Sequence, residues 1–193
     1  MLLSIGLVVV GGAHWALHRP IPHRAGMLVE SSPRQDEARD RTPVRHGDTT
    51  LQPLADFEIE ARVLSREDYM FDAGASLAPT DLALGWGRMS DSAVIDALEI
   101  SQSARYFSYR WRSVPPIPPA EIVRSATNLH AIPADAAIGR ELARVRVGEV
   151  VELRGRLVEA SRANGWRWRS SLSREDSGAG ACELMLIESI DRH

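Results

Sequence analysis

The sequence contains no lysine and only one cysteine. All 23 of its Lys and Arg positions are therefore arginines. The use of arginine in place of lysine is typical of the codon usage of a GC-rich genome. The alternative explanation is that these positions require the bidentate hydrogen bonding of a guanidinium group. The single cysteine, Cys182, excludes an intramolecular disulfide and a metal site built from several thiolates. The fold must therefore be stable without covalent cross-links.

A strong net charge is also missing. The formal net charge is −3 and the sequence pI is about 6.1, so no global positive field attracts nucleic acid, and we do not expect a nucleic-acid partner. The hydrophobic content of 44% and the charged content of 25% are those of an ordinary folded protein. A length of 193 residues is sufficient for one globular domain with appendages.

Signatures of catalysis and of cofactor binding are absent as well. The sequence has no nucleophile elbow and no His-Glu-x-x-His motif. Residues 174–180 contain an acidic pair and two glycines, but too few oxygen donors at the spacing of a calcium loop. We interpret that stretch as a hairpin loop, and we expect neither a cofactor nor a metal ion.

The N-terminus is the longest apolar stretch of the chain. Residues 2–17 are apolar apart from Ser4 and His14, a length within the range of a signal-anchor. The residues that follow are bulky or charged rather than small, so no signal-peptidase site is evident. We predict that residues 1–17 form an uncleaved, single-pass anchor in a bacterial inner membrane.

The orientation of this anchor depends on the basic residues around it. Arg19 and Arg24 follow the apolar run, and the positive-inside rule alone would keep the domain in the cytoplasm. Basic residues encoded upstream of Met1 would reverse this. We expect the domain on the extracytoplasmic side.

The stretch 18–56 has the composition of a linker. It is rich in proline and carries a dense run of charges over 34–48, which favours extended, weakly structured chain. Alternation of apolar and polar residues then starts at Phe57 and predicts a half-buried strand over 57–64. We therefore place the globular domain at 57–193.

Further strands and helices follow from local patterns. Phe107, Tyr109 and Trp111 would share one face of a strand within 99–112. Asn164-Gly165 predicts a hairpin inside 145–173. The last strand is expected over 182–190. Helices are predicted over 93–98, after the capping residues 90–92, and over 134–146, where apolar residues recur at helical spacing.

This order of elements predicts an α+β domain that is mainly β. It favours a small, partly open barrel of the OB-like type, or a curved antiparallel sheet. About five strands and two or three short helices are expected, preceded by the apolar N-terminal helix.

One candidate site is a ligand-binding face built from arginines and aromatic rings, which combine charge with stacking. Its residues would be Arg110, Arg112, Trp166, Arg167, Trp168 and Arg169. The alternative is that these positions show only the ordinary alternation of half-buried strands, with arginine on the solvent side. The acidic net charge favours a protein or glycan ligand over nucleic acid.

A second candidate site is hydrolytic. His130 is a general base for neutral pH, and Asp176 or Glu175 would orient it toward a serine. The serines considered are Ser101, Ser103 and Ser171. The alternative is that His130 is a hydrogen-bonded structural residue, because no motif frames it.

Several runs of the chain resemble a family of uncharacterised bacterial proteins with an N-terminal membrane segment. These runs are ARVLS (61–65), DLALGWGRMSD (81–91), NLHAIPA (128–134), GWRWRSS (165–171) and REDSGAGACE (174–183). The resemblance covers most of the chain from Phe57 onward. It implies a bacterial, membrane-associated domain and implies no particular activity.

Together these observations predict a membrane-tethered, non-enzymatic domain that binds a protein, a glycan or another envelope ligand. The alternative is an envelope hydrolase that uses His130 with Asp176 or Glu175.

Overall fold

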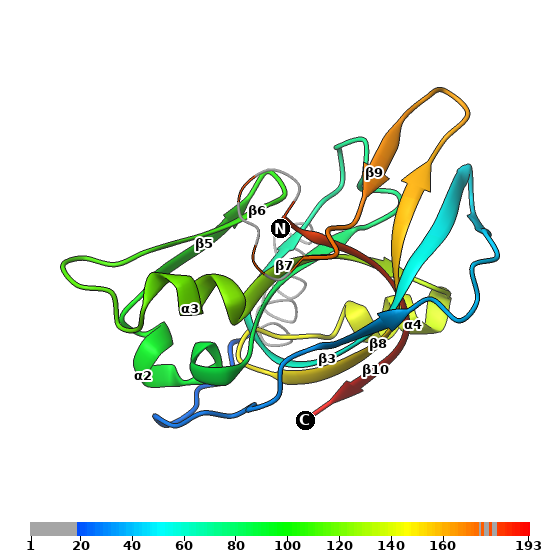
Figure 1. Cartoon of the computed structure of the whole chain (residues 1–193). Helices are drawn as coiled ribbons and strands as arrows, with labels where there is room; N and C mark the ends of the chain where they lie inside the picture. Colours follow the sequence, from blue (N-terminus) through cyan, green and yellow to red (C-terminus); the bar gives the residue numbers. More distant parts are fainter. Residues whose placement is uncertain (1–18, 174, 176–177, 179–180) are drawn as a thin grey trace, which may run out of the picture.

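A computed structural model describes residues 19–173, 175, 178 and 181–193. The chain folds mainly into β-structure, with a curved, partly ring-like sheet at its centre (Figure 1). The longest strand is β3 (Thr49–Asp68), which also pairs with β1 (Arg34–Glu37) and β2 (Val44–His46). In β3, Phe57, Ile59 and Val63 are buried at alternate positions, as their spacing predicts.

Five of the strands form a closed circuit of pairings. From β3 the order runs to β4 (Thr80–Gly85), β7 (Ala126–Pro133), β10 (Glu183–Arg192) and β8 (Val150–Ser161), and β8 pairs with β3 again. All these pairings are antiparallel except that of β7 with β10, which is parallel. The sheet is curved, as expected, but it is mixed rather than antiparallel throughout. A parallel pair requires a crossover connection, which here passes through a helix and β8.

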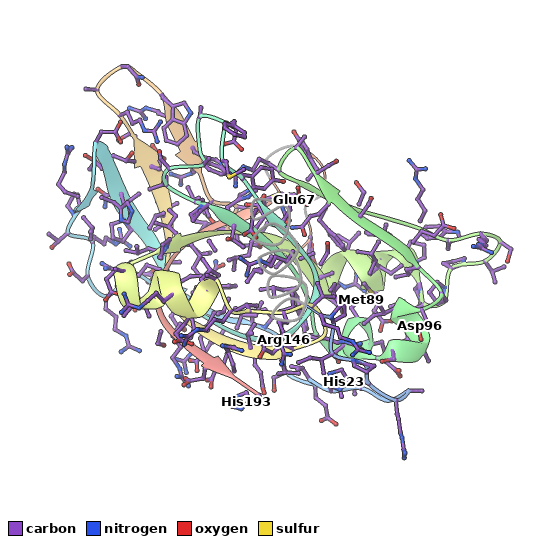
Figure 2. All side chains as sticks on the ribbon, turned by 180° about the vertical axis from the view of Figure 1, so that it is seen from behind. His23, Glu67, Met89, Asp96, Arg146 and His193 are labelled. Atoms are coloured by element: carbon purple, nitrogen blue, oxygen red, sulfur yellow. The ribbon has the colours of Figure 1, made fainter. Side chains whose placement is uncertain are left out.

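Helix α4 (Ala136–Leu142) lies between β7 and β8. It begins at Asp135, whose side chain accepts hydrogen bonds from the backbone N–H groups of Ala137 and Ile138. Leu142 is buried in the same core as Leu153 of β8. The prediction of a helix here is confirmed, with bounds shorter than 134–146. Side chains fill the interior of the sheet (Figure 2).

A smaller unit is inserted between β4 and β7. It contains a 3-10 turn (Gly87–Ser90), α2 (Ser92–Ile95), the two-stranded sheet of β5 (Glu99–Ser103) and β6 (Tyr106–Arg110), and α3 (Pro119–Arg124). The β5–β6 hairpin lies beside α3, with its turn next to the main sheet and its other end directed away from the sheet (Figure 1). Its inner face packs on a core cluster that includes Met89 and Ile122.

Two segments differ from the sequence-based expectation. The single strand expected within 99–112 is a hairpin, because the chain reverses at Ala104 and Arg105, whose φ angles are +50° and +70°. Neither residue is a turn former, so the sequence gives no signal of this reversal. The range 18–56, predicted as a linker, contributes β1, β2 and the first part of β3. Leu51 and Ala55 are buried there, so the alternation of β3 starts before Phe57.

The segment before β1 lies along the outside of the sheet. Ile21 donates a backbone hydrogen bond to Val147, and His23 Nε2 lies 2.8 Å from the carbonyl oxygen of Gly148. Figure 2 shows His23 on the same side of the molecule as Arg146. The predicted anchor at 1–17 and most of the loop 174–180 lie outside the described residues. Within the described part of the chain, no helix combines the length and the apolar character that crossing a bilayer requires.

The candidate site around Arg105 and His130

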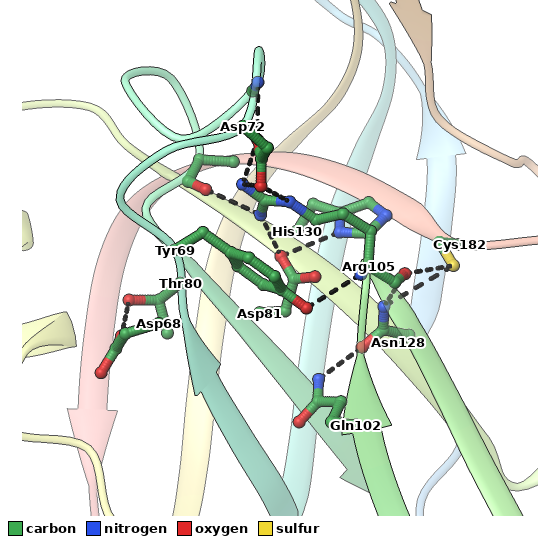
Figure 3. A network of polar contacts seen from close by, with 12 residues as sticks. Asp68, Tyr69, Asp72, Thr80, Asp81, Gln102, Arg105, Asn128, His130 and Cys182 are labelled. Atoms are coloured by element: carbon green, nitrogen blue, oxygen red, sulfur yellow. Dashed lines mark hydrogen bonds and ion pairs between the residues drawn. The ribbon is translucent and has the colours of Figure 1, made fainter.

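A network of polar side chains is centred on Arg105, in the turn between β5 and β6 (Figure 3). Its Nη1 donates to Oδ1 of Asp81 at 2.7 Å and to the carbonyl oxygen of Ala78 at 2.9 Å. Its Nε and Nη2 donate to the two carboxylate oxygens of Asp72 at 2.9 and 3.0 Å. The guanidinium carbon lies 3.7 Å from the centroid of the Tyr69 ring. Arg105 therefore ties the hairpin to β4 and to the β3–β4 loop.

The backbone of this turn is strained. Both Ala104 and Arg105 have positive φ angles, a conformation that Asn and Gly adopt at low cost in a two-residue hairpin turn. Non-glycine residues in this region cost about 1 kcal/mol or more each, and they persist where the surrounding contacts over-determine them, often at functional sites. The contacts of Arg105 supply such constraints.

Asp81 and His130 lie directly opposite each other on β4 and β7. Their side chains are 0% and 3% exposed, and Nδ1 of His130 lies 2.9 Å from Oδ1 of Asp81. The six-residue strand β4 is buried along its whole length, so a carboxylate in it requires a partner from a neighbouring strand. The Trp168 ring covers His130 with a centroid separation of 4.5 Å.

Three buried polar atoms of this region lack a hydrogen bond of good geometry to any described residue. They are Oδ2 of Asp81, Oε1 of Gln102 and Nδ1 of His130, which is close to Asp81 but poorly aligned with it. Buried polar groups in folded proteins are nearly all satisfied, so exceptions require an explanation. The backbone strain and the unsatisfied atoms occur in the same place, which marks this region as the candidate functional site.

Asn128 and Cys182 form the other side of the network. Asn128 accepts a hydrogen bond from Gln102 at 2.6 Å and donates to the carbonyl oxygen of Arg105 at 2.9 Å. Its Nδ2 also lies 3.7 Å from the sulfur of Cys182, and that sulfur lies 3.9 Å from the carbonyl oxygen of Arg105. The thiol is thus placed beside the strained turn.

A cavity of about 300 Å³ opens onto this network, at the lower end of the range for small-molecule sites. Its lining combines aromatic, thiol, imidazole and guanidinium groups, from Ala104, Arg105, Tyr106, His130, Trp168, Arg169 and Cys182. A second cavity, of about 130 Å³, shares Tyr106 and Cys182 with it and continues toward Phe107, Tyr109 and Ile122.

The surroundings also shift the pKa values of two side chains, Asp72 and Tyr69. Burial tends to raise the pKa of Asp72, but hydrogen bonds from Arg105 and from the backbone N–H of Gly74 outweigh it and hold this pKa below its ordinary value. Burial raises the pKa of Tyr69, whose hydroxyl accepts a hydrogen bond from the backbone N–H of Arg105. Asp72 is therefore held in its charged form and Tyr69 in its neutral form.

Among the described residues that were predicted for a hydrolytic site, His130 is the one that lines this cavity. Glu175 is exposed, and Asp176 lies outside the described residues. The carboxylate beside His130 is Asp81, which sequence reasoning overlooked together with Arg105. The available signal was a carboxylate within the apolar run of 80–85, where an unpaired charge is unfavourable.

The predicted arginine and aromatic face is divided in the structure. Strand β9 (Arg167–Arg169) brings Trp168 to the cavity, and Trp166 lies 6.1 Å from Trp168 in an edge-on arrangement. Arg167 and Arg169 both pair with Glu159 of β8. Arg110 lies at the end of β6 that is distant from the Arg105 turn, and Arg112 pairs with Glu99. The cavity therefore includes Trp168 and Arg169 from this set.

No group of three or more His, Cys, Asp or Glu side chains suited to a metal ion occurs in the part of the chain that the structure describes. Comparison of the chain with models of protein families, with curated proteins and with solved structures finds no match.

Proposed function

We propose that this chain is a membrane-tethered binding domain of the bacterial envelope, and that its ligand enters the cavity lined by His130 and Trp168. A glycan is the favoured ligand class, because aromatic faces stack on sugar rings and the polar groups of the cavity can hydrogen-bond to hydroxyls. The observation that carries this proposal is the position of the cavity on the sheet.

We infer that the closed circuit of strands is an OB-like barrel. Support comes from the strand order β3-β4-β7-β10-β8, with α4 between β7 and β8. Barrels of this kind bind oligonucleotides and oligosaccharides on their second and third strands and on two flanking loops. Here the second and third strands are β4 and β7, which carry Asp81 and His130. The β3–β4 loop supplies Asp72, and the connection between β8 and β10 supplies Trp168, on β9.

Charge favours a glycan over nucleic acid. The net charge is −3. The arginines of β8 and β9 form ion pairs with neighbouring carboxylates: Arg154 with Glu58, Arg156 with Glu188, and Arg167 and Arg169 with Glu159. A nucleic-acid phosphate would have to compete with these carboxylates.

Titration calorimetry of the domain with soluble envelope glycan fragments tests this function. We expect Trp168→Ala to weaken binding at least about tenfold, since loss of a stacked ring costs about 1–3 kcal/mol. Trp111→Ala is the matched control, because Trp111 packs on the inserted unit. Equal affinity of Trp168→Ala and the wild-type protein would contradict the proposal, as would the absence of binding to any of the glycans.

The orientation of the predicted membrane anchor, residues 1–17, is tested separately. A C-terminal reporter that is active only outside the cytoplasm should give signal, while a matched reporter that is active only inside should not. The opposite result would place the domain in the cytoplasm and would exclude an envelope glycan as its ligand.

A second candidate function is hydrolysis, and one observation favours it. His130 has a buried carboxylate beside it, 2.9 Å from Nδ1, and its ring lines the cavity. Asp81 thus occupies the position that the sequence-based hypothesis gave to Asp176 or Glu175. A histidine with a carboxylate beside one ring nitrogen is the pairing that a general base uses.

A further inference from the structure

We propose that Cys182 is a nucleophile for acyl transfer, with His130 as its general base and Asp81 as the residue that positions His130. This inference rests on the second candidate function, hydrolysis, and identifies its reacting group and its substrate class. A cysteine alone does not make a site. Here His130, with only 3% of its side chain exposed, lines the same cavity as the thiol.

Strand pairing places these side chains on one face of the sheet. Strand β10 runs parallel to β7, with Leu184 opposite His130. Side chains two residues apart on a strand share a face. Asn128 and His130 therefore share one face of β7, and Cys182, two residues before Leu184, lies next to Asn128 on the same side. The contact of 3.7 Å between Asn128 Nδ2 and the Cys182 sulfur agrees with this register.

The imidazole of His130 lies between the carboxylate of Asp81 and the cavity. Asp81 lies next to Nδ1 and therefore favours the tautomer with its proton on that nitrogen. The other nitrogen, Nε2, points away from Asp81 (Figure 3) and retains its lone pair. Arg105 donates a hydrogen bond to the same Asp81 oxygen and so fixes the position of the carboxylate. The N–H of Asn128 is a donor for the thiolate that forms.

The proposed reaction requires only water as co-reactant. Nε2 takes the proton of the Cys182 thiol while the sulfur attacks the carbonyl carbon of an ester or amide. The bond to the leaving alcohol or amine breaks, and that group receives the proton from Nε2, which leaves a thioester on Cys182. Water, deprotonated by Nε2, then hydrolyses the thioester and restores the thiol.

The cavity indicates the substrate class. Its volume of about 300 Å³ lies at the lower end of the range of volumes of small-molecule sites. Tyr106 and Trp168 form part of its wall. A carboxylic ester or amide with a small acyl group fits these dimensions, and its apolar part would contact the two rings.

The single cysteine makes the first test specific, because any thiol labelling of the protein reports on Cys182. Iodoacetamide alkylation of the full chain is followed against pH by mass spectrometry. An unassisted thiol reacts with an apparent pKa of about 8.5. We expect the wild-type profile to lie at least about one unit lower, and we expect His130→Gln to slow alkylation at neutral pH about tenfold. His193→Gln, at the exposed C-terminus, is the matched control.

The positioning role of Asp81 is tested separately. Asp81→Asn should move the alkylation profile in the same direction as His130→Gln, and Asp81→Glu should partly restore it. A carboxylate that only supports the fold would change the amount of folded protein and leave the pH profile of the folded fraction unchanged.

The second test detects the intermediate. The wild-type protein is mixed with p-nitrophenyl acetate and analysed intact. We expect one added acetyl group on Cys182 and none in Cys182→Ser. A wild-type thiol with an ordinary alkylation profile and no acetyl adduct would overturn the inference. Both wild-type measurements remain decisive even if His130→Gln fails to fold. Glycan binding that depends on Trp168 can hold or fail independently of either result.

Discussion

Arg105 and Asp81 are in direct contact, with Nη1 of Arg105 only 2.7 Å from Oδ1 of a carboxylate that is wholly buried. The arginine comes from a strained two-residue turn in the inserted unit, and the aspartate from a strand of the main sheet. Burial of Asp81 as a charged group depends on this contact, because an uncompensated charge in the interior is very unfavourable. The pair therefore couples the inserted unit to the main sheet.

Arg105→Ala tests this coupling. Loss of one partner of a buried ion pair costs about 3–5 kcal/mol, so urea denaturation should show a loss of that order in the free energy of unfolding. Arg167→Ala, which removes an exposed partner of Glu159, should leave the free energy of unfolding unchanged within error. Asp81→Asn combined with Arg105→Ala should recover part of the loss. A loss below about 1 kcal/mol for Arg105→Ala would mean that Asp81 does not depend on it.

Ala104→Gly should stabilise the protein. Ala104 has a φ of +50°, where glycine avoids a penalty of about 1 kcal/mol. The matched control is Ala137→Gly in α4, which should lose about 0.5–1 kcal/mol because glycine there lowers helix propensity. Thermal melts of both variants give the comparison. A lower melting temperature for Ala104→Gly would show that the turn is not strained.

Gly155→Ala should strongly destabilise the sheet. A Cβ at Gly155 would lie 2.0 Å from the backbone oxygen of Leu186, and backbone in a paired strand cannot yield without breaking the β8–β10 pairing. We expect a loss of about 2–3 kcal/mol in urea denaturation. Gly139→Ala is the control, because the nearest atom to its Cβ would be 3.8 Å away, in Pro133. Similar effects of the two variants would contradict the close approach at Gly155.

The contribution of Asp72 to stability should depend on pH. Its pKa in the folded protein lies below the ordinary value of 3.8, despite burial, because of hydrogen bonds from Arg105 and Gly74. A lowered folded pKa gives stability that is present above the ordinary value and is lost as pH falls through the folded value. Asp72→Asn should therefore melt below the wild-type protein at neutral pH, and the difference should shrink below pH of about 4. A difference that is constant across pH would contradict this.

Local patterns predicted much of the secondary structure. Alternation identified the buried face of β3, and Asn164-Gly165 correctly marked the β8–β9 turn, where Gly165 has a φ of +89°. Asp135 and the spacing behind it identified α4. These features depend on residues close together in the chain. Their backbone preferences and side-chain directions determine the local structure without contacts from the rest of the fold.

Contacts between distant residues decided the remainder. The pairing of β3 with β8, the parallel pairing of β7 with β10, and the reversal at Ala104-Arg105 have no local signal. The sequence by itself indicated a β-rich domain and singled out His130. Only the tertiary structure placed Asp81 and Cys182 around it, because each comes from a different strand or loop and they meet only after the sheet has curved and closed.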